Sequence, residues 1–336
     1  MAAPKISVIM AAWNAEKTIL GSIASVQAQT FSDWELVVAD DGSTDKTAAL
    51  VEKLAEVDSR VHLIRLEHGG AAKARNAAVR ASNGAYLAVL DSDDASAPER
   101  LETQAAYMDA HPEVLAVGGW CRQCGRVWKP PCSNGAIQYV LAFGNPFAHS
   151  TVMIRRQVFG EGYRADLTAS EDYEILARIG ASGKVANLPK ILSERALRPE
   201  SIGVRLAREQ NAIAANVAAS IMKKRHPTEN PALVEELARM NFSKVVPAQD
   251  RGELRALHAR IVKACLESFP EDAREIRKFA AEHVAERRNE LFGTSLREHM
   301  LRTCAVVRYY WRWPKSLVYL LLTETLGLKI RRAAGT

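Results

Sequence analysis

The sequence predicts an α/β protein with a doubly wound, mainly parallel β-sheet, followed by a helical C-terminal region. Over the first two hundred residues, apolar strand-like runs alternate with helical stretches, which is typical of a parallel sheet covered by helices on both faces. From about Val204 the chain becomes rich in Ala, Leu, Glu and Arg, in helical stretches interrupted by prolines. A chain of 336 residues with 48% hydrophobic residues can bury a sizeable core. We expect two domains, residues 1–203 and 204–336.

Four strand and helix pairs form the first part of the predicted sheet. The expected strands are residues 6–10, 34–39, 61–66 and 85–90, and the expected helices are residues 16–28, 45–57, 71–82 and 98–110. The sequence contains neither GxGxxG nor GxxxxGK[ST], which disfavours a dinucleotide-dependent dehydrogenase and a P-loop kinase.

The first two strands end in residues that could contact a nucleotide. Trp13 follows the first strand, where its indole could pack in the core or stack on a base. The second strand runs into the segment 40–45, where Gly42 permits a tight turn and Asp45 or its neighbours could cap the next helix. Asp41 could instead accept a hydrogen bond from a base.

A small-residue turn, Gly69–Gly70, follows the third strand and leads into a helix that carries Lys73 and Arg75. Small residues let the backbone approach a phosphate, and the helix N-terminus with these cations supplies positive charge. The alternative is a solvated lysine and an arginine packed along the sheet edge. The residues alone leave both roles open for Lys73 and Arg75.

The fourth strand delivers the acidic cluster Asp91-Ser92-Asp93-Asp94 to its carboxyl end. Open α/β sheets bind ligands at that edge, and closely spaced carboxylates suit Mg²⁺ or Mn²⁺ carrying a diphosphate. The alternative is a solvated acidic loop before the helix that begins near Pro98. The cluster therefore indicates a metal and nucleotide site.

The five cysteines do not form a disulfide pattern, because their number is odd and their spacing uneven. Cys121, Cys124 and Cys132 could hold zinc if His149 supplied the fourth ligand. We favour the alternative, a β-hairpin with its turn at Gly125.

Two later segments complete the candidate site. His149 precedes an apolar strand, and a lone histidine there is more often a hydrogen-bonded structural residue than a functional one. Thr168 and Glu171 have the spacing of a capping box at the start of a helix, so acids are expected there on structural grounds. Asp172 lies in the same first turn, where the helix dipole should lower its pKa.

The segments IMAAWN, VVADDGSTD, GGAAKARNAAV, GAYLAVLDSDD and SEDYE, taken in this order and at this spacing, resemble the inverting GT-A-type nucleotide-sugar transferases of glycosyltransferase family two. The resemblance runs from about Lys5 to about Ile202. It implies a GT-A-like fold, a bound Mn²⁺ or Mg²⁺, and transfer of a sugar from a nucleoside diphosphate donor, with UDP favoured, to an acceptor hydroxyl of a glycan or lipid-linked molecule.

Carried onto this sequence, the resemblance assigns each candidate a role. Asp172 is the catalytic base, and its reactivity should come from position rather than from a raised pKa. Glu171 and His149 lie on the acceptor side, and Asp93 with Asp91 binds the metal. Donor-binding roles fall to Ala11, Trp13, Asp41, Arg75, Asp91 and Ser92. Many relatives carry an Arg-x-His-Pro-like diphosphate clamp, which this chain lacks, so Arg195 or Arg198 could replace it.

The net charge of +6 belongs to the C-terminal part, since the rest of the chain is slightly acidic. Residues 296–332 combine Lys and Arg with Trp, Tyr and Leu, which suits either an interfacial helix on an anionic membrane or a helix packed on protein, including a homo-oligomer. No nucleic-acid motif supports a nucleic-acid partner. With no apolar run of 18 residues and no secretory signal, we expect a cytoplasmic enzyme, peripheral on the inner face of the plasma membrane if that helix binds lipid. The alternative function is a non-catalytic nucleotide-sugar-binding or scaffolding protein of the same fold.

Overall fold

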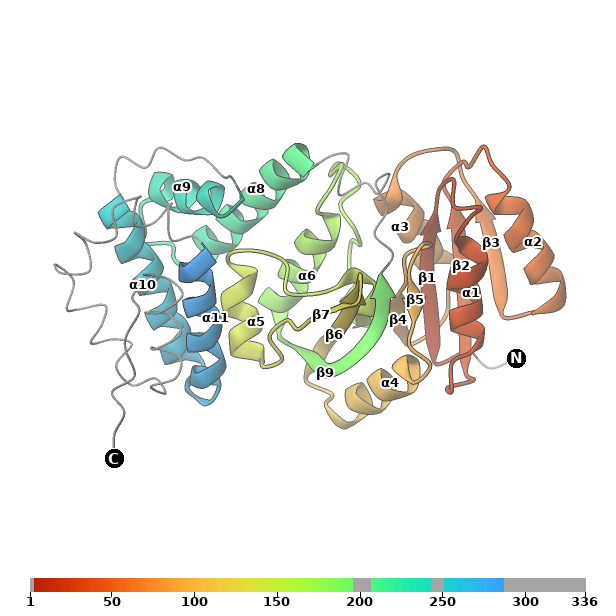
Figure 1. Cartoon of the computed structure of the whole chain (residues 1–336), viewed down its shortest axis with the longest axis horizontal. Coiled ribbons are helices and arrows are strands. Elements are labelled where there is room, and N and C mark those ends of the chain that lie inside the picture. Colours follow the sequence, from red (N-terminus) through yellow and green to blue (C-terminus); the bar gives the residue numbers. More distant parts are fainter. Residues whose placement is uncertain (1–2, 196–206, 243–250, 287–336) are drawn as a thin grey trace, which may run out of the picture. The chain divides into compact units, whose positions relative to one another are not determined.

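The computed structural model describes residues 3–195, 207–242 and 251–286 (Figure 1). Its sheet begins with the strands β1 (Ile6–Ala12), β2 (Trp34–Asp40), β3 (Val61–Arg65) and β4 (Tyr86–Val89). These four strands are parallel and lie in the order β3-β2-β1-β4. The side chains of β1, β2 and β4 are mostly apolar and buried, as expected for strands covered on both faces, whereas only Val61 is buried in the edge strand β3. The predicted α/β fold with a mainly parallel sheet is confirmed.

Helices connect these strands as the alternation of patterns predicted. They are α1 (Ile19–Gln27), α2 (Thr47–Val57), α3 (Ala71–Ala81) and α4 (Arg100–Ala110). The order of the strands reverses at β1, because β2 and β3 extend the sheet on one side of it and β4 returns to the other. Ligands of open α/β sheets bind at such a reversal, beyond the carboxyl ends of the strands. Trp13 follows β1 and Asp91 follows β4, the two neighbouring strands at this reversal.

The second half of the sheet mixes strand directions. Beyond β4 come β8 (Met153–Arg155), β6 (Val114–Gln123), β9 (Lys184–Arg195) and β5 (Ala95–Ser96), in that order. Strand β8 pairs antiparallel with both β4 and β6, and β5 pairs antiparallel with β9, while β6 and β9 pair in parallel. These strands keep the acidic cluster after β4 close to Arg195 at the end of β9.

The expected hairpin joins β6 to β7 (Arg126–Trp128), which pair antiparallel. Its turn residues Cys124 and Gly125 have φ angles of 48° and 73°, the positive values that suit a tight two-residue hairpin turn. Among the described residues, no group of three or more His, Cys, Asp or Glu side chains has the arrangement of a metal site. The hairpin favoured from the sequence is thus present in the described structure.

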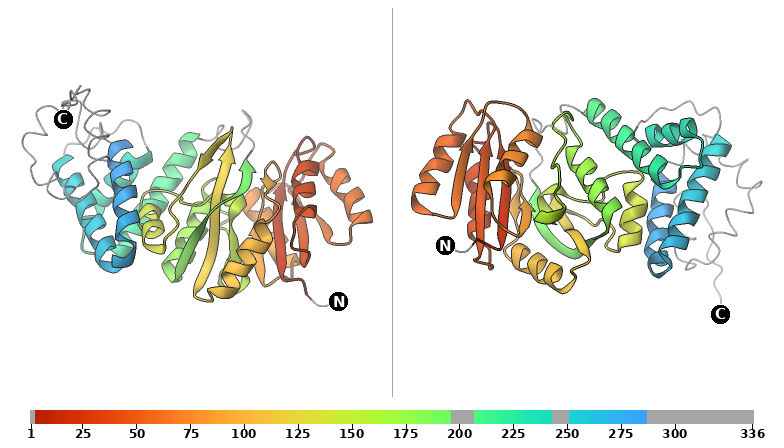
Figure 2. Two further views of the ribbon diagram at one scale, coloured as in Figure 1. Left: turned by 60° about the horizontal axis from the view of Figure 1, so that its bottom comes forward. Right: turned by 180° about the vertical axis from the view of Figure 1, so that it is seen from behind.

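The remaining helices pack together at the far end of the sheet from β3 (Figure 2). They are α5 (Asn134–Leu141), α6 (Glu171–Ser182), α8 (Ala207–Arg225), α9 (Pro231–Phe242), α10 (Arg251–Ser268) and α11 (Ala273–Glu286). Helices α10 and α11 contact α5, and α8 contacts α6 and α9. Residues 1–286 form one compact unit, and the division of the chain near residue 203 stays a prediction. None of the described helices is both long and apolar enough to cross a bilayer. The basic aromatic segment 296–332 lies outside the described residues.

Candidate active site

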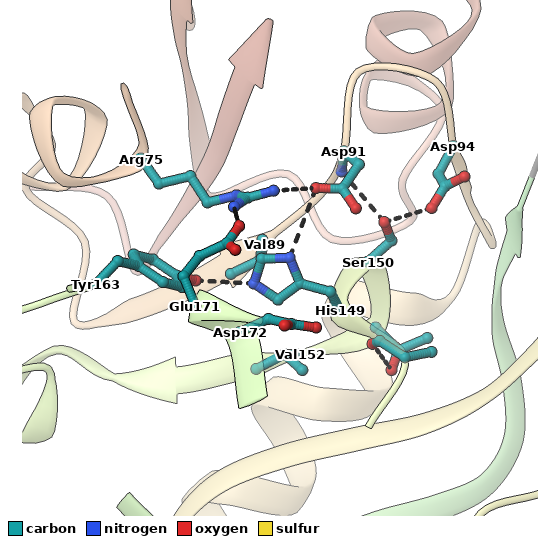
Figure 3. Close-up of polar contacts among 12 residues, drawn as sticks. Arg75, Val89, Asp91, Asp94, His149, Ser150, Val152, Tyr163, Glu171 and Asp172 are labelled. Atoms are coloured by element: carbon teal, nitrogen blue, oxygen red, sulfur yellow. Dashed lines mark hydrogen bonds and ion pairs between the residues drawn. The ribbon is translucent and has the colours of Figure 1, made fainter. Parts of the chain in front are cut away.

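Arg75 of α3 joins the acidic turn after β4 to the start of α6 (Figure 3). Its Nη2 donates to Asp91 Oδ1 at 2.8 Å and its Nη1 donates to Glu171 Oε1 at 2.6 Å. The arginine is buried, and the two carboxylates hold its pKa above the ordinary value despite the burial. The structure thus brings together three predicted residues from α3, the end of β4 and the start of α6. Direct contact of Arg75 with a donor stays a prediction.

His149 lies in the same cluster, in the short 3₁₀ helix η1 (His149–Thr151). Its Nε2 hydrogen-bonds the Tyr163 hydroxyl at 3.0 Å, and its Nδ1 lies 3.6 Å from Asp91 Oδ1. The ring is buried. Tyr163 packs edge-on against this ring and helps to hold it in place. The sequence analysis did not single out Tyr163. His149 therefore has the hydrogen bonds of a structural histidine while facing the site.

The acidic turn after β4 contains a carboxylate that the sequence analysis left without a role. Asp94 is only 4% exposed, accepts a hydrogen bond from Ser150 Oγ at 2.6 Å, and has Arg195 Nε at 3.7 Å. Ser150 Oγ also accepts the backbone N–H of Asp91 at 3.2 Å. Burial, and then the negative charges of Asp91 and Asp93, raise the pKa of Asp94 to about 7. Ser150 thus ties the two ends of the acidic turn together.

The acidic turn fits a divalent cation. Three carboxylates, Asp91, Asp93 and Asp94, lie in this turn, and the charges of Asp91 and Asp93 add to burial in raising the pKa of Asp94, so a nearby cation would offset negative charge there. A full set of protein ligands is absent among the described residues. However, Mg²⁺ at phosphate sites is usually held by one or two carboxylates together with the phosphates of the substrate. Asp93, which is partly exposed, and Asp91 remain the predicted ligands.

Asp172 lies in the first turn of α6, beside Glu171. Its Oδ2 accepts a hydrogen bond from Asn145 Nδ2 at 2.9 Å, and its Oδ1 accepts the backbone N–H of Tyr173 at 2.8 Å. Burial raises the pKa of Asp172, and Glu171 raises it further, although a protonated His149 and the Tyr173 N–H act in the opposite direction. The expectation of a lowered pKa is therefore wrong, because desolvation of the carboxylate outweighs the helix N-terminus. A carboxyl with a raised pKa is a stronger base.

The predicted capping box at the start of α6 is also wrong. The residue before the helix is Ser170, which has a φ of 58° and makes no side-chain capping bond. Thr168 Oγ1 donates instead to Glu209 Oε1 of α8 at 2.5 Å, and Glu171 pairs with Arg75. The Glu171 side chain therefore points toward Arg75 in the site and does not cap its own helix.

The ends of β1 and β2 form a polar and aromatic corner. The Trp13 ring is 42% exposed and stacks on His68, with the ring centroids 4.8 Å apart. Asp41 is buried and accepts the backbone N–H groups of Gly69 and Gly70 at 2.8 and 2.9 Å. Asp41 therefore fixes the turn before α3, a role that the sequence did not reveal. Base stacking by Trp13 and base reading by Asp41 stay predictions.

The other candidates lie along the same edge of the sheet. Ala11 is in β1, and Ser92 is partly exposed in the acidic turn. Arg195, at the end of β9, faces Asp94, whereas Arg198 lies outside the described residues. Sequence reasoning missed Arg100 of α4, which is fully buried and donates from Nη2 to the carbonyl oxygens of Val89 and Val152 just behind the acidic turn.

Replacing Arg75 should destabilise the protein strongly. Arg75→Met leaves the Asp91 and Glu171 carboxylates facing each other without their shared cation, and breaking a buried ion pair from one side typically costs about 3 to 5 kcal/mol. Urea unfolding at pH 7.5 would measure the loss. Arg65→Met is the matched control, because Arg65 and its partner Glu52 are exposed and such pairs contribute at most about 1 kcal/mol. Equal losses for both variants would contradict the bridging role of Arg75.

Known proteins are similar to this chain in sequence. The model of the family described as "Glycosyl transferase family 2" matches residues 7–161. The O-antigen biosynthesis glycosyltransferase WbnJ of Escherichia coli is 37% identical over 183 residues, which are 52% of this chain and 71% of that protein. The chain belongs to glycosyltransferase family 2. Within the family, the glucosyltransferase WfgD of Escherichia coli is 45% identical over 104 residues, 31% of this chain and 40% of WfgD.

The fold of this chain is also similar to that of solved structures. The crystal structure of residues 1–349 of S. aureus TarS in complex with UDP-GlcNAc has a TM-score of 0.55 and 20% identity. The match covers 85% of this chain and 92% of that one. At this identity the likeness shows the fold alone, which is that of the GT-A-like glycosyltransferases.

Proposed function

We propose that this protein is a metal-dependent inverting glycosyltransferase. It moves a hexosyl or N-acetylhexosaminyl group from a nucleoside diphosphate sugar, with UDP the favoured nucleotide, to an acceptor hydroxyl. Its family membership supports glycosyl transfer in polysaccharide biosynthesis. The full name of WfgD, a UDP-Glc:α-D-GlcNAc-diphosphoundecaprenol β-1,3-glucosyltransferase, supports a UDP-sugar donor and a glycan or lipid-linked acceptor.

The ion-paired Arg75 is the observation that carries the proposal. It connects Asp91, at the strand end where the nucleotide of an open α/β sheet binds, to Glu171, the residue next to Asp172. The donor side and the base therefore belong to one site. Transfer requires such a base beside the donor, whereas binding of the nucleotide sugar alone does not.

The proposed mechanism is a single displacement in which the chain's own residues take part. Asp172 takes the proton of the acceptor hydroxyl as it attacks the anomeric carbon, from the face opposite the departing diphosphate. Glu171 and His149 border the position of the acceptor. Asp93 and Asp91 would hold the divalent cation, which supplies charge stabilisation to the leaving diphosphate when bound. Arg195 adds positive charge at the same edge of the sheet.

A transfer assay tests the function. Purified protein is incubated with radiolabelled UDP-glucose or UDP-N-acetylglucosamine, Mn²⁺ and a lipid-linked or oligosaccharide acceptor, and release of UDP is followed in parallel. We expect release that requires Mn²⁺ and is suppressed by EDTA. Nucleotide-sugar binding without release or transfer in any such mixture would favour the non-catalytic alternative.

Location on the inner face of the plasma membrane is part of the same proposal. A lipid-linked acceptor would lie there, and the basic aromatic segment 296–332 could dock to anionic lipid at roughly 1 kcal/mol per basic residue near the surface. Flotation of the full chain with vesicles of phosphatidylglycerol and phosphatidylcholine tests this. Absence of binding at low salt, or unchanged binding after deletion of residues 296–336, would contradict it.

A further inference from the structure

Asn145 lies in the loop after α5, and its side chain contacts Asp172, the proposed base. Its Nδ2 donates to Asp172 Oδ2 at 2.9 Å, and its Oδ1 accepts the backbone N–H of Phe147 at 3.1 Å. The reverse orientation of the amide would place oxygen against a carboxylate and nitrogen against an N–H group, so this network allows one orientation only. The amide nitrogen of Asn145 therefore faces the base.

The loop that carries Asn145 is held on both sides. Asn187 of β9 is buried, and its Nδ2 donates to the carbonyl oxygen of Pro146 at 3.0 Å. The Asn241 side chain of α9 donates to the carbonyl oxygen of Phe143. Backbone on each side of Asn145 is thus tied to a different element, which limits movement of its side chain.

Helix α5, which leads into this loop, is held in turn by the C-terminal helices. Glu275 of α11 accepts the backbone N–H groups of Cys132 and Ser133 at 2.9 and 2.8 Å, and Asp272 accepts that of Gly135 at 2.7 Å. Carboxylates at a helix N-terminus satisfy its unpaired N–H groups and suit its dipole. Further along, the Tyr139 hydroxyl lies within hydrogen-bond distance of histidines from both α10 and α11. The α5 segment therefore has a fixed place relative to the sheet.

We propose that Asn145 is a positioning residue for Asp172, which orients the carboxylate toward the acceptor hydroxyl and stabilises its ionised form. The inference rests on the proposed function, in which Asp172 is the base. Two donors, Asn145 Nδ2 and the Tyr173 N–H, each take one carboxylate oxygen and so fix its plane. A base held in one orientation loses less entropy on reaching the transition state.

Other charged groups also act on Asp172, and a pH experiment has to hold them constant. They are Glu171 from the same helix, His149 from η1, Arg75 from α3 and the Tyr163 hydroxyl. None of them contacts Asn145 through a hydrogen bond or ion pair given for the described residues. A change at position 145 can therefore be attributed to the contact with Asp172.

Two variants separate positioning from folding. Asn145→Asp keeps the oxygen that accepts the Phe147 N–H and replaces the donor to Asp172 with a second carboxylate oxygen, whereas Asn145→Ala removes both contacts without adding a charge. The pH dependence of kcat, thermal unfolding and KM for the donor are measured for each. Asn230→Asp is the control, because the Asn230 Oδ1 accepts the Ala232 N–H at the start of α9 and an aspartate oxygen can keep that bond. We expect the acid limb of kcat to move up by about one pH unit or more in Asn145→Asp, because a second carboxylate disfavours ionisation of the base. KM for the donor should stay within about twofold, since the contact lies on the acceptor side.

The outcomes distinguish the inference from the function beneath it. An unchanged acid limb in a folded Asn145→Asp protein, or an equal loss of kcat at every pH, would show a purely structural residue and overturn the inference. If the wild type transfers no sugar, or if Asp172→Asn is fully active, the proposed function fails instead. A shift in Asn145→Asp that Asn230→Asp lacks, with wild-type thermal stability, supports the positioning role.

Discussion

Asp172→Asn should lower turnover by roughly 10² to 10⁴, the usual contribution of a positioned general base. The amide cannot take the proton of the acceptor hydroxyl, although it has nearly the same shape as the carboxylate. Affinity for the nucleotide sugar should change little, because the proposed donor contacts lie on the strand ends and not on α6. Single-turnover transfer, combined with calorimetry of UDP binding, measures both quantities.

Glu174→Gln is the matched control for this substitution. Glu174 lies in the same first turn of α6 but pairs with Arg178, away from the acidic turn. We expect near wild-type turnover from it. Sugar transfer by Asp172→Asn at a rate close to that of Glu174→Gln would place the base elsewhere.

Asp93→Asn should abolish the part of the donor affinity that depends on Mn²⁺. An amide oxygen lacks the negative charge that offsets a divalent cation beside a diphosphate. Isothermal calorimetry of UDP binding with Mn²⁺ and with EDTA should show a difference for the wild type and none for the variant. The fold should persist, since Asp93 is partly exposed at the surface of the acidic turn.

A control for the loss of one negative charge is Asp166→Asn. Asp166 is exposed and pairs only with Arg164 two residues away, so Mn²⁺ should still strengthen UDP binding to this variant. Mn²⁺-dependent affinity that survives in Asp93→Asn would remove Asp93 from the metal ligands and leave Asp91 as the candidate.

The fold was predictable because its pattern is local. Apolar runs of strand length alternate with amphipathic helices, and the acids after β4 follow directly from where that strand ends. The contacts that build the site are not local. Arg75 and Glu171 are 96 residues apart, and Asp94 and Ser150 are 56 apart. No periodicity in the sequence connects such pairs.

The errors at α6 have one physical cause. Sequence spacing described the start of the helix as if it were exposed to solvent, where a capping box and the dipole would dominate. In the folded protein, Glu171 pairs with Arg75, and Thr168 donates a hydrogen bond to Glu209. Burial raises the pKa of Asp172. Asn145 was missed for the same reason, because only the packing of the α5 loop brings it to the base.

The stereochemistry of the product tests the central claim most directly, because the claim is that one base opposite the diphosphate drives a single displacement. The measurement is proton NMR of the sugar first released or transferred from the nucleotide sugar found to be the donor, recorded before mutarotation. The account predicts an anomeric configuration opposite to that of the donor, formed by the wild type and not by Asp172→Asn. Retention of the donor's configuration would contradict it.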